Sequence, residues 1–179
     1  GPLPPGDGRI ITDTTRTRNS QPGKAGDMKL DPAQRHILTL LQKDSTLSTQ
    51  VLADKVGMSP TPCWRRVRDM EEAGVIRGYV ALVDRHKVGL GTCVWVRVKL
   101  KQHSSDVLER FEKVVKACQE VVECYELLGE TDCLLKLYLP NLEALSAFMH
   151  NFLLKIPEVD VTHSAVALRE IKNETALPL

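Results

Sequence analysis

The ten residues at positions 59–68 carry the side chains best suited to chemistry with a nucleic acid. They read Ser-Pro-Thr-Pro-Cys-Trp-Arg-Arg-Val-Arg. Guanidinium groups form paired hydrogen bonds with guanine edges and phosphates, and hydroxyl groups can bond a phosphate or touch a base edge. The indole at position 64 could pack against the sugar–phosphate backbone or complete a contact with a neighbouring wing. The predicted DNA-contacting residues are Ser59, Thr61, Trp64, Arg65, Arg66 and Arg68.

The same stretch predicts a helix that presents these side chains outward. Ser59 is a suitable N-cap, because its hydroxyl can accept a hydrogen bond from a free amide of the first turn. Pro60 then falls at the first helical position, where its missing N–H costs nothing. Cys63, Val67 and Met70 follow with the spacing i, i+4, i+7 and form one apolar stripe. The cationic side chains are left mainly on the other faces, as in a helix that enters the major groove.

Two earlier segments complete a helix-turn-helix. Residues 47–56 fit a short amphipathic helix with Ser48 or Thr49 as its cap, and residues 57–59 form a tight link that contains glycine. Residues 31–42 predict a further helix, which begins with an Asp-Pro pair. The alternative is an ordinary three-helix bundle with a solvated arginine face. The glycine turn, the Ser-Pro start and the cluster of arginines together favour the helix-turn-helix.

The segments after these helices change in character. Residues 75–83 predict a short strand or hairpin arm, which would be a wing beside the helices, and residues 84–91 resemble a hinge. The remaining elements follow the order β-α-β-β-α-β of a ferredoxin-like domain, with four antiparallel strands and both helices on one face. The other sheet face carries apolar side chains, and self-association is the usual way to cover such a face. The strands are expected at 94–100, 121–128, 133–139 and 159–171, and the helices after Ser104 or Ser105 and from Asn141 to before Pro157.

The predicted fold is therefore α+β, with a winged helix-turn-helix followed by a ferredoxin-like domain. Residues 1–29 are rich in Gly and Pro and predict a disordered arm, or in part the remnant of a cleavage tag. The helix-turn-helix domain with its hinge spans 30–91, the second domain 92–172, and a tail 173–179. Lys and Arg exceed Asp and Glu slightly before residue 92, whereas acidic residues exceed basic ones after it. This polarity suits a DNA-facing module joined to one that does not face DNA.

The cysteine and histidine positions favour neither a metal site nor an enzyme. Five cysteines stand at 63, 93, 118, 124 and 133, with no CxxC pair, so neither a disulfide framework nor a zinc site is expected. With no signal peptide and no apolar run of about 18 residues, we expect a cytoplasmic protein. Catalysis would need a constellation that His103, His150 and His163 do not form by any recognisable spacing. We therefore predict no catalytic residues, no metal and no cofactor.

The residues that specify these elements resemble the Lrp/AsnC (leucine-responsive, feast/famine) family of transcriptional regulators. The resemblance covers about residues 30–175. It is carried by Ser59-Pro60-Thr61-Pro62-Cys63 with Arg65, Arg66 and Val67, by the Gly78-Tyr79 arm, and by Gly129-xx-Asp132 between two strands. A bacterial subgroup that includes a cysteine-detoxification regulator is resembled at Thr61–Trp64, Gly89-Leu90-Gly91, His103-Ser104-Ser105 and the Thr-Ala-Leu-Pro-Leu end.

The resemblance implies sequence-specific transcriptional control of duplex DNA, switched by a small amino acid such as cysteine, leucine or another small apolar one. It also implies a homodimer formed through the sheet, which assembles into octamers or other higher forms. The effector would lie in a cleft between dimers, near the Gly-xx-Asp turn. Carried over by position, its site would be formed by Gly129, Glu130, Thr131, Asp132 and Cys133, faced by Thr162 and Ser164.

The chemistry of these residues is consistent with an amino-acid site. Asp132, with Glu130 as a second candidate, can pair with an ammonium group, while turn amides and nearby hydroxyls can bind a carboxylate. The alternative is an ordinary hairpin turn in which Gly and Asp serve the turn alone. Cys133 could exchange with a thiol ligand or be a buried, inert cysteine. A module that senses a metabolite without touching DNA is a further alternative, which the basic helix face disfavours.

Overall fold

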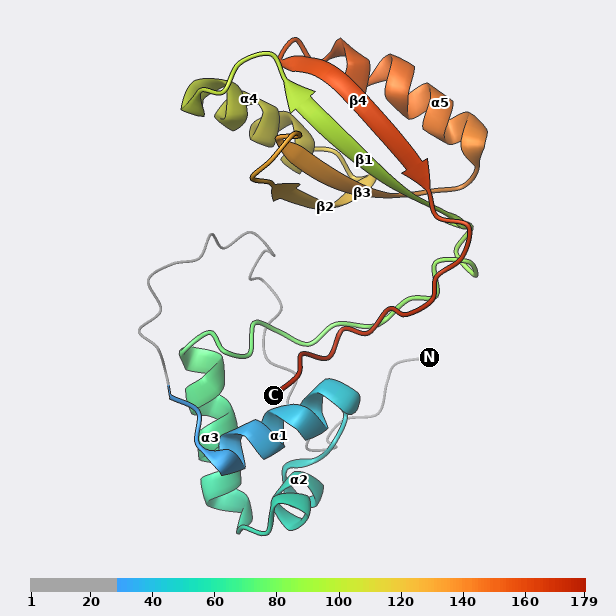
Figure 1. The fold of residues 1–179 in the computed structure, drawn as a ribbon. Coiled ribbons are helices and arrows are strands. Elements are labelled where there is room, and N and C mark those ends of the chain that lie inside the picture. Colours follow the sequence, from blue (N-terminus) through green and yellow to red (C-terminus); the bar gives the residue numbers. More distant parts are fainter. Residues whose placement is uncertain (1–28) are drawn as a thin grey trace. The chain divides into compact units, whose positions relative to one another are not determined.

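The computed structural model describes residues 29–179, so the arm predicted over residues 1–29 lies, up to residue 28, outside the described residues. The described chain forms two compact units (Figure 1). The first contains residues 29–81 together with Lys172–Leu179, and the second is Leu82–Ile171. The predicted hinge, residues 84–91, thus lies within the second unit, and the predicted tail belongs to the first.

The first unit contains the three predicted helices, α1 (Pro32–Lys43), α2 (Thr49–Val56) and α3 (Pro60–Glu72), which Figure 1 shows packed together. Helix α1 begins with a complete capping box. The Asp31 carboxylate accepts from the Gln34 amide at 2.8 Å, and the Asp31 amide donates to the Gln34 side chain at 3.0 Å. This reciprocal pair satisfies two amides that the first helical turn leaves free.

The links around α2 follow the prediction in most respects. Ser48 caps α2 by accepting from the Val51 amide, and Gly57 takes the left-handed conformation (φ 74°) that ends the helix. Ser59 occupies the N-cap position of α3, but its side chain makes no capping hydrogen bond. The expectation of a capping hydroxyl at Ser59 was therefore wrong. Pro62 accounts for part of this, because it stands at the third helical position, where proline offers no amide for a capping hydroxyl to bind.

Aliphatic and sulfur-containing side chains form the core of the first unit. The stripe predicted on α3 is confirmed, because its three residues are at most 1% exposed. They pack against buried residues of the two preceding helices. The buried members of this core are Ile37, Leu38, Leu41, Leu52, Ala53, Cys63, Val67 and Met70.

Residues 75–83 form no strand, which corrects the arm predicted there. A strand needs a neighbour for its backbone hydrogen bonds, and none of the described strands pairs with this segment. Its first part is instead fastened to α3. Ile76 packs against the core of the first unit, and the Tyr79 hydroxyl donates to Glu71 Oε1 at 2.9 Å. Burial and this carboxylate raise the pKa of the Tyr79 phenol.

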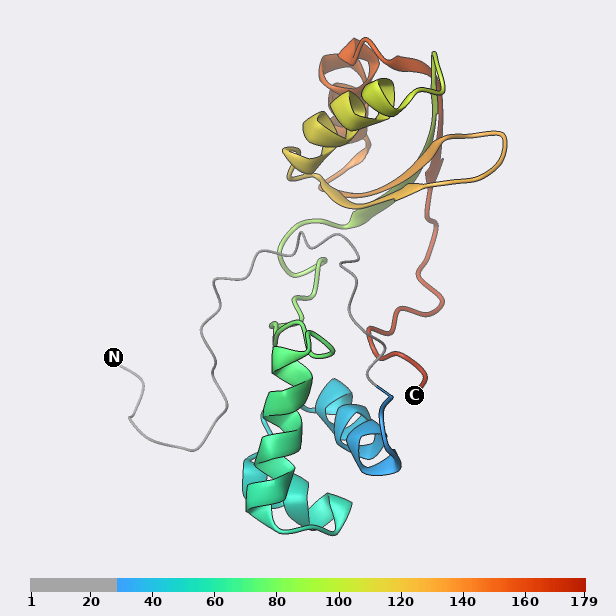
Figure 2. The same ribbon diagram turned by 90° about the vertical axis from the view of Figure 1, so that its left-hand side faces the viewer.

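The second unit is the predicted ferredoxin-like domain. Its sheet has the order β2-β3-β1-β4, and all neighbouring strands are antiparallel. Helices α4 and α5 cover one face of the sheet (Figures 1 and 2). Strands β2 and β4 end earlier than predicted, at Glu126 and Val166. The elements are β1 (Thr92–Leu100), α4 (Ser105–Lys116), β2 (Val121–Glu126), β3 (Cys133–Leu139), α5 (Leu142–Asn151), a 3-10 turn (Leu153–Lys155) and β4 (Val159–Val166).

The core of this unit lies between the sheet and its two helices. Alternate residues of β1 and β3 point into it, as the strand pattern predicts. Phe111 of α4 and Phe148 of α5 pack against them. The buried strand residues are Val94, Val96, Val98, Leu100, Cys133, Leu135, Leu137, Leu139 and Val159.

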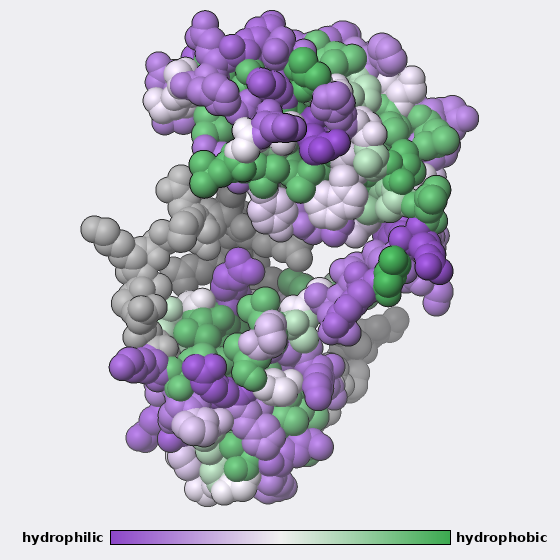
Figure 3. All heavy atoms as spheres, in the orientation of Figure 1, coloured by the Kyte–Doolittle hydropathy of each residue, from purple (hydrophilic) through white to green (hydrophobic). Residues whose placement is uncertain are grey.

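The opposite face of the sheet, which none of the helices in residues 29–179 covers, carries aromatic and charged side chains. The Lys136 ammonium lies 5.2 Å from the centroid of the Trp95 ring and 5.4 Å from that of Tyr138. It also forms an ion pair with Glu123 at 2.9 Å. Figure 3 shows hydrophobic residues among hydrophilic ones on the viewed face of each unit. Several large apolar side chains outside the sheet are also exposed, namely Val80, Leu82, Val83, Leu168 and Ile171.

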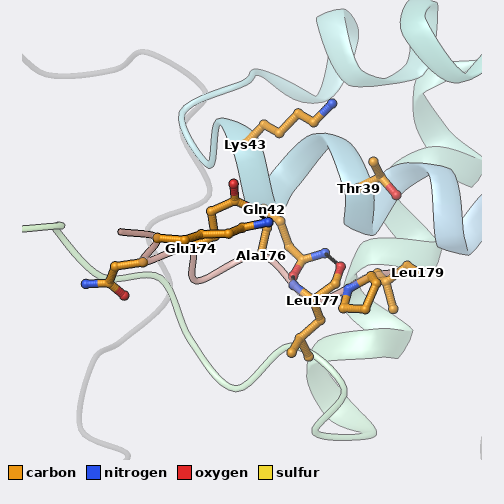
Figure 4. A pocket seen from close by; sticks show the side chains of 10 residues that line it. Thr39, Gln42, Lys43, Glu174, Ala176, Leu177 and Leu179 are labelled. Atoms are coloured by element: carbon orange, nitrogen blue, oxygen red, sulfur yellow. Dashed lines mark hydrogen bonds and ion pairs between the residues drawn. The ribbon is translucent and has the colours of Figure 1, made fainter. Parts of the chain in front are cut away.

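The end of the chain is held on α1 by one glutamine (Figure 4). The Leu177 amide donates to Gln42 Oε1 at 2.6 Å, and Gln42 Nε2 donates to the Leu177 carbonyl at 3.2 Å. The side-chain amide thus pairs with the backbone as a neighbouring strand would. Residues 172–174 and 176–179 line an open pocket of about 660 Å³ together with Thr39, Gln42 and Lys43 of α1.

Replacing Gln42 with methionine is expected to release this tail. Methionine has a similar length but can neither accept from nor donate to Leu177. The amide of Leu177 should then exchange with solvent about five- to tenfold faster, as loss of roughly 1 kcal/mol of hydrogen bonding implies. NMR hydrogen exchange measures this directly. Gln50→Met is the matched control, because Gln50 is bonded to Asp54 within α2. Equal Leu177 exchange in wild type and Gln42→Met would contradict the docking.

Candidate DNA-binding and effector sites

The outer face of α3 presents four of the six predicted DNA-contacting residues. Thr61, Trp64, Arg65 and Arg68 are exposed, while the apolar stripe on the opposite side is buried. The buried stripe therefore fixes the helix to the core of the first unit, while its polar face is accessible to solvent. Of the arginines at these positions, Arg65 is the one that forms no hydrogen bond or ion pair with any residue between 29 and 179. Its guanidinium is ready to bind an acceptor from outside the chain.

Arg68 and Trp64 lie together on this face. The Arg68 guanidinium stands 5.4 Å from the centroid of the Trp64 ring, and its Nε donates to Glu72 Oε1 at 2.8 Å. Both partners of this ion pair are more than half exposed. Such pairs contribute little to stability, so Arg68 can leave Glu72 for a phosphate at small cost. Ser59, at the N-cap position of the helix, is also exposed, and its hydroxyl makes no capping hydrogen bond.

Arg66 differs from its neighbours because it faces α1. Its side chain is about one-third exposed, and its Nη1 pairs with Asp31 Oδ2. The other oxygen of that carboxylate caps α1. The Gln34 amide, and then the Arg66 guanidinium, hold the pKa of the Asp31 carboxyl below its usual value. Arg66 therefore ties α3 to the start of α1, whereas the sequence alone showed only three arginines within four residues.

The predicted effector turn lies at one end of the sheet, between β2 and β3. The Leu127 amide donates to the Asp132 carbonyl at 2.8 Å, and the Asp132 amide donates to the Val98 carbonyl at 3.0 Å. Gly129 has a φ of 145°, a backbone conformation that residues other than glycine rarely adopt. Gly129 and Glu130 are exposed and Thr131 is half-buried, so these three predicted residues line the outer surface of the turn.

The Asp132 carboxylate is turned inward. The residue is 8% exposed. Its Oδ2 accepts from the Leu100 amide at 2.6 Å, and its Oδ1 lies 2.8 Å from His103 Nδ1, within ion-pair distance. The carboxylate thus joins the end of β1 to the loop that leads into α4. His103 had not been predicted as a partner of this turn. A signal for it existed, since His103 lies three residues after the strand that pairs with β3.

Cys133 also faces inward. It is 1% exposed, in the core of the second unit, and its thiol lies beside the exposed Cys124 thiol of β2. A hydrogen bond that the Cys133 thiol donates to Cys124, together with burial, raises the pKa of the Cys133 thiol. The same hydrogen bond lowers the pKa of Cys124. Cys133 is thus placed as a buried thiol that stays protonated.

Thr162 and Ser164 lie on β4, at the same end of the sheet but not beside the turn. Thr162 pairs with Val98 on one side of β1, and Cys133 pairs with Val98 on the other. With strands about 4.8 Å apart, Thr162 and Cys133 are separated by about 10 Å of backbone. Ser164 donates to the sulfur of Met149 at 3.7 Å. One chain therefore does not bring the seven predicted effector residues into a single pocket.

Neither a metal-binding cluster nor a membrane-spanning helix is found among the described residues. Among residues 29–179, no three His, Cys, Asp or Glu side chains are arranged to hold a metal ion. Within that same range, no helix has the length and apolar character needed to cross a membrane.

Comparison with known proteins gives matches over both units. Residues 30–77 match a winged helix-turn-helix DNA-binding model, and residues 93–177 match the Lrp/AsnC ligand binding domain. The leucine-responsive regulatory protein of Escherichia coli K12 is 38% identical over 157 residues, which are 88% of this chain and 93% of that protein. The DNA-binding transcriptional activator DecR of the same strain is 37% identical over 150 residues, which are 84% of this chain and 99% of that protein.

Solved structures of regulators match as well. An AsnC family transcriptional regulator from Agrobacterium tumefaciens is 45% identical, with a TM-score of 0.79 over 83% of this chain and 97% of that one. A transcriptional regulator from Neisseria meningitidis, solved as a complex with L-Met, is 37% identical, with a TM-score of 0.80 over 83% of this chain and 96% of that one. These matches cover both units that the structure separates. The chain belongs to the Lrp/AsnC family of transcriptional regulators, and it combines a winged helix-turn-helix DNA-binding domain with a ligand-binding domain.

Proposed function

We propose that the chain controls transcription by laying the first turns of α3 in the major groove, with Arg65 as the principal base-reading residue. The single observation that carries this is the exposed Arg65 guanidinium, which has no partner among the described residues. It stands on a helix whose apolar stripe is packed into the core of the first unit. Thr61 contacts a base edge or a thymine methyl group. Ser59, Trp64 and Arg68 contact the sugar–phosphate backbone, and Arg66 holds the angle of the helix.

Two copies act together on one operator. The aromatic and charged sheet face around Trp95, Lys136 and Tyr138 is the surface through which a homodimer forms. Exposed apolar residues of the linker support further assembly, to an octamer or another higher form. A symmetric dimer presents two α3 helices to half-sites about 34–36 Å apart, which is one turn of DNA. The family resemblance and the open face both support this assembly.

A small amino acid is the effector, and the protein that it controls works in the bacterial cytoplasm. The candidates are cysteine, leucine and other small apolar amino acids; the names of the leucine-responsive relative and of the L-Met complex support this class. The site is the outer surface of the Gly129–Asp132 turn. Since Thr162 and Ser164 are too far away in one chain, they complete the site from a neighbouring copy. The chain has no catalytic role, consistent with relatives that are transcriptional regulators.

Thermal-shift screening of the twenty amino acids tests the effector, because a ligand that binds only the folded state raises the melting temperature. At least one small apolar amino acid should raise it in a concentration-dependent manner.

A gel-shift titration on operator DNA tests the proposed DNA binding. Affinity should fall more than about tenfold between 50 and 200 mM salt, because phosphate contacts release counterions. A salt-independent affinity would contradict DNA binding, and absence of any thermal shift would contradict amino-acid sensing.

A further inference from the structure

We propose that Arg85 is a positioning residue for DNA recognition, which fastens the linker to the sheet face of the dimer and so fixes the path of the linker in each copy. This inference rests on the proposed dimer formed through the face around Trp95, Lys136 and Tyr138. It places a closed turn where the sequence predicts a hinge, over residues 84–91. It also makes the preferred spacing of half-sites depend on a residue that does not touch DNA.

The first observation is that residues 84–91 form a closed turn. The Asp84 carboxylate accepts from the His86 amide at 2.9 Å, which begins the turn. The Leu90 amide donates to the Arg85 carbonyl at 2.7 Å, which closes it. A segment whose backbone is bonded to itself in this way is not a free pivot.

The second observation is that the Arg85 side chain binds this turn to the sheet. Its Nη1 donates to the Gly91 carbonyl at 2.5 Å and to the Leu90 carbonyl at 3.3 Å, just before β1 begins. The guanidinium carbon also lies 5.3 Å from the centroid of the Tyr138 ring, on β3. The residue is half-buried, and partial burial strengthens a contact between a cation and an aromatic ring. One side chain therefore joins the end of the linker to two neighbouring strands.

The ring that Arg85 contacts belongs to the proposed dimer face. Lys136 Nζ lies 5.4 Å from the centroid of the same Tyr138 ring and 5.2 Å from that of Trp95. A second copy packed on this face covers the ring against which Arg85 lies. The turn is then fixed relative to the dimer interface as well as to its own sheet.

The third observation is that little of the linker is left free. The Tyr79 hydroxyl is bonded to Glu71 of α3 at 2.9 Å, whereas residues 80–83 form no hydrogen bond with other described residues. Four residues span at most about 14 Å, but opening the turn would free residues 80–91, which span about 40 Å. A short tether holds two DNA-binding units near one spacing, and a long tether accepts several spacings. The Arg85 contacts decide which of the two lengths applies.

The experiment compares spacings of half-sites. A duplex that the full wild-type chain selects from a random library supplies the half-site, which is then tested singly and in pairs about 10 or about 15 base pairs apart. Wild type should prefer the pair one turn apart by about tenfold or more. Arg85→Ala should reduce this preference to about threefold or less, with unchanged affinity for the single half-site.

Three further variants sharpen the test. Arg85→Lys keeps a cation that can donate to a carbonyl and lie against the Tyr138 ring, so it should retain most of the preference. Lys87→Ala is the matched control, because Lys87 lies in the same turn and its exposed side chain forms no hydrogen bond or ion pair with other described residues. Arg85→Ala is also combined with Gln42→Met, so that the docked tail cannot restrain the first unit and hide the effect.

The outcomes separate this inference from the proposed DNA binding. A lost preference in Arg85→Ala, or in the double variant relative to Gln42→Met, supports the positioning role if analytical ultracentrifugation shows an intact dimer. A preference equal to wild type in both refutes it. A dissociated dimer, or weaker binding of the single half-site, means that Arg85 acts through the dimer or the fold instead. If wild type binds DNA without a preferred spacing, the inference fails while DNA binding stands; if it selects no duplex, the proposed function itself fails.

Discussion

Replacing Arg65 with alanine is expected to weaken operator binding by about 10- to 100-fold, which corresponds to roughly 1–3 kcal/mol for one base-reading arginine. Arg65 is exposed on α3 and has no partner within residues 29–179 that it would leave behind. Its removal should therefore leave the melting temperature unchanged. Gel shifts on the operator and on a scrambled duplex measure the loss, which should be larger for the operator.

Two arginines serve as controls for this prediction. Arg110→Ala removes the same charge from the second unit, where Arg110 pairs with Glu158 at 2.7 Å, and should leave DNA affinity near that of wild type. Arg66→Ala should instead lower the melting temperature of the first unit, because it leaves Asp31 without its partner on α3. A loss of equal size for operator and scrambled DNA in Arg65→Ala would make Arg65 a phosphate contact. No loss at all would refute its role in recognition.

Sequence patterns predicted the helices and the sheet because each depends on residues close in the chain. Asp31 and Ser48 cap their helices through amides three residues ahead, and a cap of this kind can be recognised without any tertiary structure. The alternation of β3 likewise reports which side of the sheet is buried. The strand predicted over residues 75–83 failed for the complementary reason. A strand forms only where a partner supplies hydrogen bonds.

The roles of single side chains were harder to predict, because they depend on partners distant in the sequence. Arg66 resembles its two arginine neighbours until Asp31, 35 residues earlier, is found beside it. Asp132 fits the place of an ammonium-binding carboxylate, but its Oδ2 accepts from the Leu100 amide and its Oδ1 lies 2.8 Å from His103 Nδ1. A motif therefore indicates where a site lies more reliably than it indicates which atom contacts the ligand. The geometry gives each of these two residues a partner within the chain.

The second large effect is expected from Asp132→Ala, which should lower the free energy of unfolding of the second unit by roughly 2–4 kcal/mol. The substitution removes a buried acceptor and leaves the Leu100 amide without its partner. Asp132→Asn should cost less, because one oxygen remains for that amide. Asp160→Ala, which removes an exposed carboxylate from β4, should change stability by no more than about 0.5 kcal/mol.

Urea denaturation followed by circular dichroism measures these differences, and their pattern decides what Asp132 does. If it supports the end of β1 and thereby the turn, stability and effector binding should fall together in Asp132→Ala and both recover in part in Asp132→Asn. A carboxylate that bound the ammonium directly would behave differently. Its loss would abolish binding in both variants while stability changed by less than about 1 kcal/mol. The second pattern would return Asp132 to the role that its motif suggests, because a buried acceptor cannot be lost without destabilising the donors it serves.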